Sequence, residues 1–126
     1  MKKTHVVAGL AIAYAFGLDP VHVVIGTLLP DADYKLLHRR LLHNLFVLFL
    51  VLFLSFEVFV GMLSHITLDM LTKMGVGLLW PVSRRMFRVG EFRTGGIFDW
   101  VLFVLFLVSW IYFDLIWVAR ASPLGV

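Results

Sequence analysis

The stretch His65-Ile66-Thr67-Leu68-Asp69 places an imidazole and a carboxylate four residues apart. Residues four apart lie on one face of an α-helix, so His65 and Asp69 can both point to one metal ion. Two ligands do not complete a metal site, and the fold must therefore bring other side chains to this helix. The further candidates all lie upstream: His5, Asp31, Asp33, His38 and His43.

The composition indicates a membrane protein. The chain has 126 residues, enough for one domain over residues 1–126, and 61% of them are hydrophobic. A mean hydropathy of +0.96 is too apolar for a soluble domain of this size. There is no cysteine, so a metal here would have to be held by His and carboxylate groups. No basic domain or recognition motif points to nucleic acid.

The first part of the chain predicts two short helices. Residues 5–16 are helical by composition and end at Gly17, and Asp19-Pro20 is typical of an N-cap followed by proline in the first helical turn. Pro30 ends the second helix near Leu28. At 1.5 Å per residue these helices measure roughly 18 and 14 Å, too short to cross a hydrocarbon core of ~30 Å singly. We therefore expect a helical hairpin over about residues 5–29.

The next forty residues predict a second hairpin, over about residues 34–73. As one helix they would run about 60 Å, twice the membrane thickness, so the helix must break. The best position is Leu54 to Glu57, where Ser55 can cap a new helix that has Glu57 in its first turn. A single membrane span over residues 44–63 is the alternative. The two hairpins together would form a four-helix cluster.

Charge placement favours the two hairpins. With them, ten basic residues share one side of the membrane and Arg120 is alone on the other; with single spans at residues 6–29 and 44–63 the division is seven against four. The positive-inside rule then assigns the ten to the cytoplasm. They are Lys2, Lys3, Lys35, Arg39, Arg40, Lys73, Arg84, Arg85, Arg88 and Arg93.

This arrangement also gathers the His and Asp candidates at the cytoplasmic end of the cluster. Residues 97–119 form the one full-length transmembrane helix, with Trp100 near one end and Tyr112 and Trp117 near the other as interfacial aromatics. The expected fold is an all-α integral protein of the cytoplasmic membrane, with the N-terminus and the site in the cytoplasm and the C-terminus outside.

Several of these residues occur in the order found in a known family. The ordered segments are Thr4-His5 with Gly9, Leu29-Pro30-Asp31-Ala32-Asp33, His38-Arg39 followed by His43, Gly61 with Ser64-His65 and Asp69, and Gly75-Val76 followed by Leu79-Trp80-Pro81. Over residues 4–88 they resemble the YdjM-like membrane-bound metal-dependent hydrolases, and their order is more distantly similar to the zinc-dependent phospholipase C and nuclease group. Arg40, Leu42 and Asn44 stand where the family usually has Gly, Thr and Ser.

The resemblance implies a metal-dependent hydrolase, and the residues are coherent with it. Seven ligands exceed the shell of one zinc ion, which predicts two divalent ions, with zinc favoured over manganese and iron. The seven are His5, Asp31, Asp33, His38, His43, His65 and Asp69. Asp31 or Asp69 is the expected general base.

The expected substrate is a phosphoester, or another ester, of a lipid or lipid-linked molecule at the cytoplasmic interface. Arg39 and Arg40, with Arg84, Arg85 and Arg88 on the same side, would receive an anionic head group. Membrane lipid is the expected partner, and the oligomeric state stays open.

Other interpretations of these residues remain open at the level of sequence. Asp31 can be a turn residue after Pro30, Asp33 the N-cap of the third helix, and residues 84–93 a topology determinant. Asp99 is a weaker candidate for a supplementary ligand. The cluster can also belong to a non-catalytic membrane subunit, which the changes at Arg40, Leu42 and Asn44 favour slightly, or to the proton or ion pathway of a transporter or channel.

Overall fold

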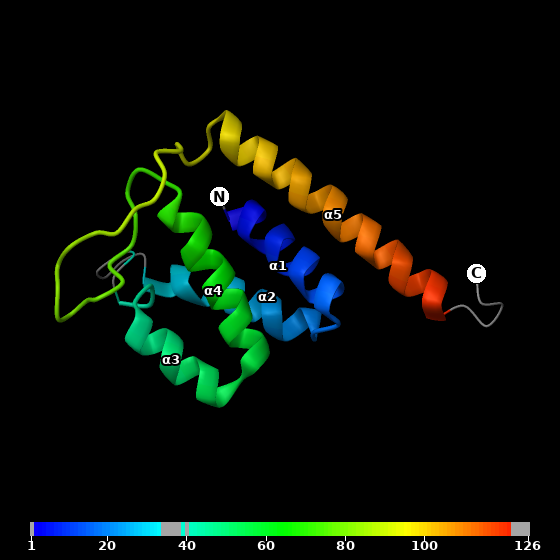
Figure 1. The fold of residues 1–126 in the computed structure, drawn as a ribbon, viewed down its shortest axis with the longest axis horizontal. Helices are drawn as coiled ribbons and strands as arrows, with labels where there is room; N and C mark the ends of the chain where they lie inside the picture. Colours follow the sequence, from blue (N-terminus) through cyan, green and yellow to red (C-terminus); the bar gives the residue numbers. More distant parts are fainter. Residues whose placement is uncertain (1, 34–38, 40, 122–126) are drawn as a thin grey trace.

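The computed structural model describes residues 2–33, 39 and 41–121, and the regular elements of this part of the chain are helices (Figure 1). Its five α-helices are α1 (Lys2–Phe16), α2 (Pro20–Leu28), α3 (Leu45–Leu54), α4 (Phe56–Met70) and α5 (Ile97–Ala121). A 3-10 helix, η1 (Leu29–Asp33), follows α2. The described residues contain isolated β-bridges but no named strand.

Helices α1 and α2 are joined by a short turn and pack against each other. Gly17 adopts a positive φ of 69° at this turn, and the Asp19 carboxylate accepts a hydrogen bond from the Val21 amide as the N-cap of α2. The predicted Gly17 stop and the Asp19-Pro20 start are therefore confirmed.

The third helix begins later than predicted. Helix α3 starts at Leu45, and residues 41–44 before it are not helical. Its N-cap is Asn44, whose side chain accepts a hydrogen bond from the Val47 amide, whereas Asp33 is the last residue of η1. The alternative role of Asp33 as this N-cap is therefore wrong.

The predicted break within the long apolar stretch is at Ser55. This residue ends α3 with extended backbone (φ −158°, ψ 122°), and its hydroxyl accepts a hydrogen bond from the Val58 amide at the start of α4. A single continuous helix over residues 44–63 is therefore wrong. Helices α3 and α4 pack against each other and enclose a core that includes Leu48, Met62 and Ile66.

Two glycines bring α2 and α4 into close contact. A Cβ atom at Gly61 would lie 2.1 Å from the carbonyl oxygen of Val23, and one at Gly26 would lie 2.2 Å from that of Val58. Both obstacles are backbone atoms, so neither can move without separating the helices. This contact fixes α4 relative to the last turn of α2.

Gly61→Ala should therefore destabilise the protein by about 2 kcal/mol, the usual cost of overpacking. Thermal unfolding in detergent, followed by circular dichroism, measures this change. Ser109→Ala is the control, because Ser109 is on α5 and its hydroxyl only donates to the Leu105 carbonyl within the same helix. An equal melting temperature for Gly61→Ala and the wild type would contradict the close packing.

Helix α5 is long and apolar enough to cross a membrane, and residues 97–120 form such a stretch. The predicted transmembrane helix is thus matched in position, while α3 is apolar but shorter. Large apolar side chains are exposed on both helices, among them Phe49 and Phe53 on α3 and Val104 and Val108 on α5. A surface of this kind suits contact with lipid.

Helix α5 lies alongside α1, and the two helices run parallel (Figure 1). At one end the Thr4 hydroxyl donates to the Asp99 carboxylate and the Lys3 ammonium lies 3.2 Å from the centroid of the Trp100 ring. At the other end the Trp117 indole N–H donates to the carbonyl of Tyr14. Thr4 thus lies within α1, and its hydroxyl links α1 to α5.

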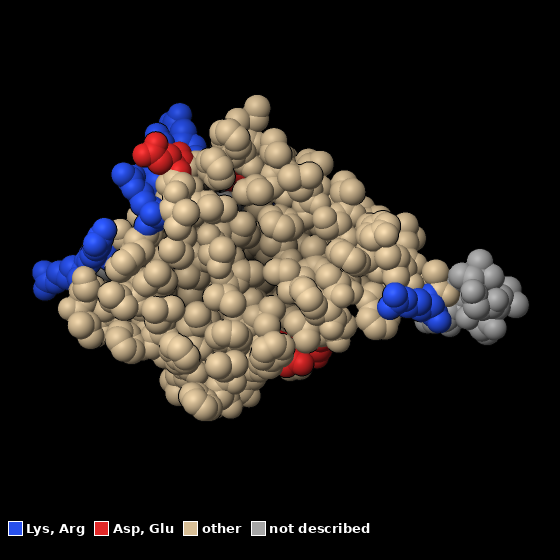
Figure 2. All heavy atoms as spheres, in the orientation of Figure 1, with Lys and Arg blue, Asp and Glu red and all other residues tan. Residues whose placement is uncertain are grey.

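Basic side chains gather at the end of the molecule where the connection between α4 and α5 lies, and another lies beside the C-terminal end of α5 (Figure 2). The connection contains Lys73, Arg84, Arg85, Arg88 and Arg93, and Arg120 is in the last turn of α5. Backbone hydrogen bonds order this segment, including a reciprocal pair between Val76 and Phe87.

Candidate metal centre

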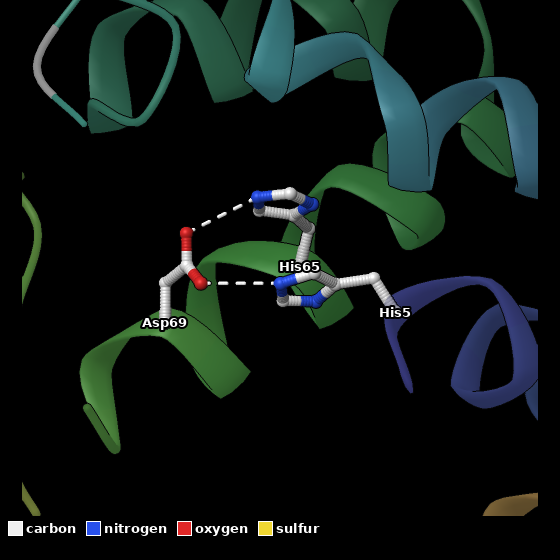
Figure 3. Close-up of side chains that lie close together, drawn as sticks. All are labelled: His5, His65 and Asp69. Atoms are coloured by element: carbon white, nitrogen blue, oxygen red, sulfur yellow. Dashed lines mark hydrogen bonds and ion pairs between the residues drawn. The ribbon is translucent and has the colours of Figure 1, made fainter. Parts of the chain in front are cut away.

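Three histidines from different parts of the chain surround the Asp69 carboxylate. His5 Nε2, on α1, lies 3.1 Å from Asp69 Oδ1. His65 Nε2, one turn earlier on α4, lies 3.1 Å from Oδ2, and His43 Nε2, just before α3, lies 3.0 Å from the same oxygen. Figure 3 shows His5 and His65 facing the two oxygens of Asp69. His5 and Asp69 are 64 residues apart in sequence, yet all four groups form one cluster.

The imidazoles are also packed against one another in the interior. The rings of His5 and His65 stack with centroids 3.8 Å apart and an angle of 13° between their planes. His43 meets His65 edge-on, and their two Nε2 atoms are 3.2 Å apart. The residues His43, His65, His5 and Asp69 are all at most 2% exposed. Polar groups buried this deeply need partners.

The tautomer of His65 follows from its second ring nitrogen. His65 Nδ1 lies 2.6 Å from the carbonyl oxygen of Thr27 in α2. A carbonyl oxygen only accepts hydrogen bonds, so Nδ1 must carry the proton, and Nε2 of the neutral ring presents a lone pair. That lone pair faces Asp69 Oδ2 at 3.1 Å and Asp31 Oδ1 at 3.5 Å.

A lone pair facing two carboxylates is stabilised by a metal ion between them, by a second proton on the ring, or by an N–H from His43, whose Nε2 is 3.2 Å away. A histidine that donates one N–H to a backbone carbonyl while the other nitrogen faces the site is the usual arrangement of a metal ligand. The donor chemistry therefore fits a divalent ion.

Two groups of side chains could hold such an ion. One consists of His5, His65 and Asp69, and the other of Asp31, His43 and His65, with the ligand atoms of each group within 4.8 Å of one another. Both groups use His65, whose Nδ1 is occupied by Thr27, so His65 can bind an ion of only one group. Within the described side chains, the second ion of a pair would have to rely on the remaining imidazoles and carboxylates.

Arg39 supports the cluster from the side of the α4 C-terminus. Its guanidinium Nη2 lies 3.5 Å from Asp69 Oδ1, and its Nη1 donates to the Thr72 hydroxyl and to the Gly75 carbonyl at 3.3 Å. Arg39 is 7% exposed. Its backbone has a positive φ of 62°, which is uncommon for residues other than Gly, Asn or Asp. In this structure Arg39 therefore contacts the protein's own groups rather than an open surface.

The environment shifts two pKa values in the cluster. Burial alone would raise the pKa of the Asp69 carboxyl, but hydrogen bonds from His43 and His5 outweigh burial and hold that pKa below its ordinary value. Burial lowers the pKa of His5 below its ordinary value of 6.5, against the opposing effect of its hydrogen bond to Asp69. Asp69 is thus a carboxylate and His5 a neutral imidazole at pH 7, the forms that bind metal ions.

Not all the predicted site residues can be placed in the cluster. His38 and Arg40 lie outside the described residues, and for Asp33 only the backbone of η1 is described. Asp31 is at the edge of the cluster, with its side chain 20% exposed. Asp99 belongs to neither group of candidate ligands, since its carboxylate accepts from the Thr4 hydroxyl and the Gly95 amide.

Two contributors were missed by sequence reasoning. The carbonyl of Thr27 orients His65, and the hydroxyl of Thr72 contacts Arg39 and the Asp69 carbonyl. The first is a backbone group, which no side-chain pattern can reveal. Thr72 is three residues after Asp69. A threonine at this spacing near the end of a helix can donate its hydroxyl to the earlier carbonyl, and this is the one signal for Thr72 in the sequence.

Comparisons with known proteins point to a family of membrane proteins. A family model described as "YdjM inner membrane protein" matches residues 1–124. The "Uncharacterized protein YvsG" of Bacillus subtilis (strain 168) is similar, with 28% identity over 155 aligned residues that cover 94% of this chain and 97% of the relative. Because the aligned length exceeds the 126 residues of this chain, the relative contains residues without a counterpart here. No solved structure matches.

Proposed function

We propose that this chain, which belongs to the YdjM inner membrane protein family, is a membrane-bound metal-dependent hydrolase that cleaves a phosphoester of a lipid. The observation that carries the proposal is the lone pair of His65 Nε2, which faces the Asp31 and Asp69 carboxylates while Nδ1 is fixed by Thr27. A cation-binding cluster of imidazoles and carboxylates is the usual basis of metal-assisted hydrolysis.

His5, His65 and Asp69 would hold the first divalent ion, with zinc favoured, and His43 with Asp31 would contribute to a second. Such ions lower the pKa of a nearby water and stabilise negative charge on a phosphoester. The two carboxylates have different roles in this proposal. Asp69 is surrounded by three imidazoles and Arg39 and serves only as a ligand. Asp31 is partly exposed, so one of its oxygens would bind the second ion while the other accepts the proton of the attacking water.

The proposed membrane placement follows the charges. Two helical hairpins, α1 with α2 and α3 with α4, enter the bilayer from the cytoplasmic side, and α5 crosses it. Lys2, Lys3 and the basic connection between α4 and α5 would then lie in the cytoplasm, and Arg120 would lie on the outer side. In this placement the metal centre is at the level of the cytoplasmic head groups, since Thr4 contacts Asp99 in the first turn of α5.

The basic residues of the α4–α5 connection are the better candidates for an anionic head group. Arg84, Arg85 and Arg88 are exposed, whereas the guanidinium of Arg39 is buried against Asp69 and Thr72. We therefore assign Arg39 the task of positioning Asp69 and assign substrate attraction to the exposed arginines.

A second candidate function is a non-catalytic membrane subunit in which the cluster holds a structural ion. The burial of His43, His65, His5 and Asp69 favours it, because structural sites are closed and catalytic sites keep a position open to water. In the proposed hydrolase that position lies beside Asp31, the one partly exposed member of the described cluster.

Turnover of a chromogenic phosphodiester by the purified protein, with added zinc or manganese, distinguishes the two functions. The hydrolase proposal expects metal-dependent turnover that Asp31→Asn reduces by about 100-fold or more, the usual contribution of a general base. His22→Ala is the matched control, since His22 is exposed and pairs with Asp19 away from the cluster. Metal binding without turnover by the wild type would support the structural subunit.

A further inference from the structure

An apolar groove lies along α1, between α4 and α5. Helices α4 and α5 both pack against α1, but these two described helices do not pack against each other, and α1 lies between them (Figure 1). The resulting cavity has a volume of about 300 Å³. Ala8 and Ile12 of α1, residues of α4 between Val60 and Leu68, and Phe106 of α5 line it.

The groove offers carbon surface to an occupant. Its two hydroxyl-bearing residues, Ser64 and Thr67, donate hydrogen bonds to the carbonyls of Gly61 and Leu63 within α4. Neither hydroxyl therefore needs a ligand as its acceptor. An apolar occupant is consequently preferred over a polar one.

The groove begins next to the metal centre along the chain, because Ala8 is one helical turn after His5 and Leu68 directly precedes Asp69. His5, Ala8 and Ile12 are spaced three and four residues apart, so they form one stripe along α1, with His5 at the end nearest the Asp69 carboxylate. Because α1 runs parallel to α5, positions after His5 lie progressively deeper along the membrane span. Phe106 is about 14 Å along α5 from Ile97 at 1.5 Å per residue, well within a hydrocarbon core of ~30 Å.

The dimensions favour a hydrocarbon chain over a helix. From Val60 to Leu68 the α4 wall is about 12 Å long, close to the ~15 Å depth of one leaflet. A helix is about 10 Å across with its side chains, so individual side chains but not a whole helix could enter a groove of this volume. A single acyl chain is much thinner and is the molecule that surrounds α5 in a bilayer.

We propose that this groove binds one acyl chain of a membrane lipid and holds the ester group of that lipid beside the His/Asp cluster. The inference rests on the proposed hydrolase function, and it narrows the substrate class to a lipid whose tail enters between α4 and α5. The groove thus determines which substrate binds, while His5, His65 and Asp69 lie where its ester group would be cleaved.

Lipid retention in native mass spectrometry tests this assignment without relying on catalysis. The protein is purified from vesicles of phosphatidylglycerol and phosphatidylethanolamine, exchanged into detergent, and examined for bound lipid. The wild type should retain one lipid per chain. Thr67→Phe and Ser64→Leu fill the groove with additional carbon and should lower retention by at least fivefold.

Val108→Phe is the matched control, because Val108 is two residues from Phe106, about 200° around α5, and is exposed to the opposite side. It should retain lipid as the wild type does. Zinc content should be unchanged in all three variants, since none alters His5, His65 or Asp69. A variant that has lost its helical circular dichroism has lost its fold, and the remaining filling variant then decides the result.

Equal lipid retention in the filling variants and the wild type would overturn the groove assignment. So would a dimer of the wild type that Thr67→Phe dissociates, because the occupant would then be a second copy. The two proposals can fail separately. Phosphodiester turnover together with equal lipid retention in the filling variants and the wild type would support the hydrolase but not the groove. Reduced retention in the filling variants without turnover would support the groove but not the hydrolase.

Discussion

Purified His65→Ala protein should bind zinc at least about 100-fold more weakly than the wild type, because loss of a direct ligand exceeds the 10–100-fold cost of losing an outer partner. His65 is common to both candidate groups of ligands, so no other single histidine should have as large an effect. Isothermal titration with zinc, and zinc content after purification, measure the change.

His22→Ala is again the control for this experiment, since it removes an imidazole from α2 without touching the cluster. Its zinc affinity should equal that of the wild type. If His65→Ala also bound zinc normally, the cluster would be a network of buried imidazoles and carboxylates held together by protons. A transporter or channel that uses these groups as a relay would then become the better hypothesis.

The second large effect is expected for Asp69→Asn. This change keeps the shape of the side chain but removes the negative charge that His5, His43, His65 and Arg39 surround. Removing one partner from a buried charged network usually costs about 3–5 kcal/mol, because the remaining charge is left uncompensated. Thermal unfolding of metal-free protein in detergent measures this cost separately from metal binding.

Asp19→Asn is the matched substitution for comparison. Asp19 is exposed and caps α2, and asparagine caps helices as well as aspartate does, so the stability should change by no more than about 0.5 kcal/mol. Similar melting temperatures for Asp69→Asn and Asp19→Asn would mean that Asp69 is not the centre of the buried network.

Local signals in the sequence were sufficient for most helix boundaries. Asp19-Pro20 and Ser55 have side chains that complete the first turn of a helix, and the apolar length of residues 97–121 exceeds what any other described helix offers. The predicted start of the third helix, near Tyr34, was wrong, because α3 begins at Leu45. Asn44, which caps it, was considered only as a departure from the family pattern.

The candidate site was predictable in membership more than in detail. The spacing of His65 and Asp69 predicted that they share one face of a helix. His5 and His43 were candidates among the upstream residues, and the structure brings both to within 3.1 Å of Asp69. The role of Thr27 was not predictable, because its carbonyl reaches His65 only through the contact of Gly26 with α4. The buried position of Arg39 was not predictable either, because arginine rarely adopts the positive φ that this residue has in the structure.

The parallel packing of α1 and α5 also affects the surrounding bilayer. Helix α1 has 15 residues and is about 22 Å long, yet the turn that follows it contacts Trp117, far along α5. In the proposed placement Lys2 and Lys3 lie at the cytoplasmic surface, and the exposed Asp19–His22 pair then lies short of the opposite edge of a ~30 Å hydrocarbon layer. Head groups and water must descend to this pair, so hydrophobic mismatch should make the protein most stable in lipids with short acyl chains.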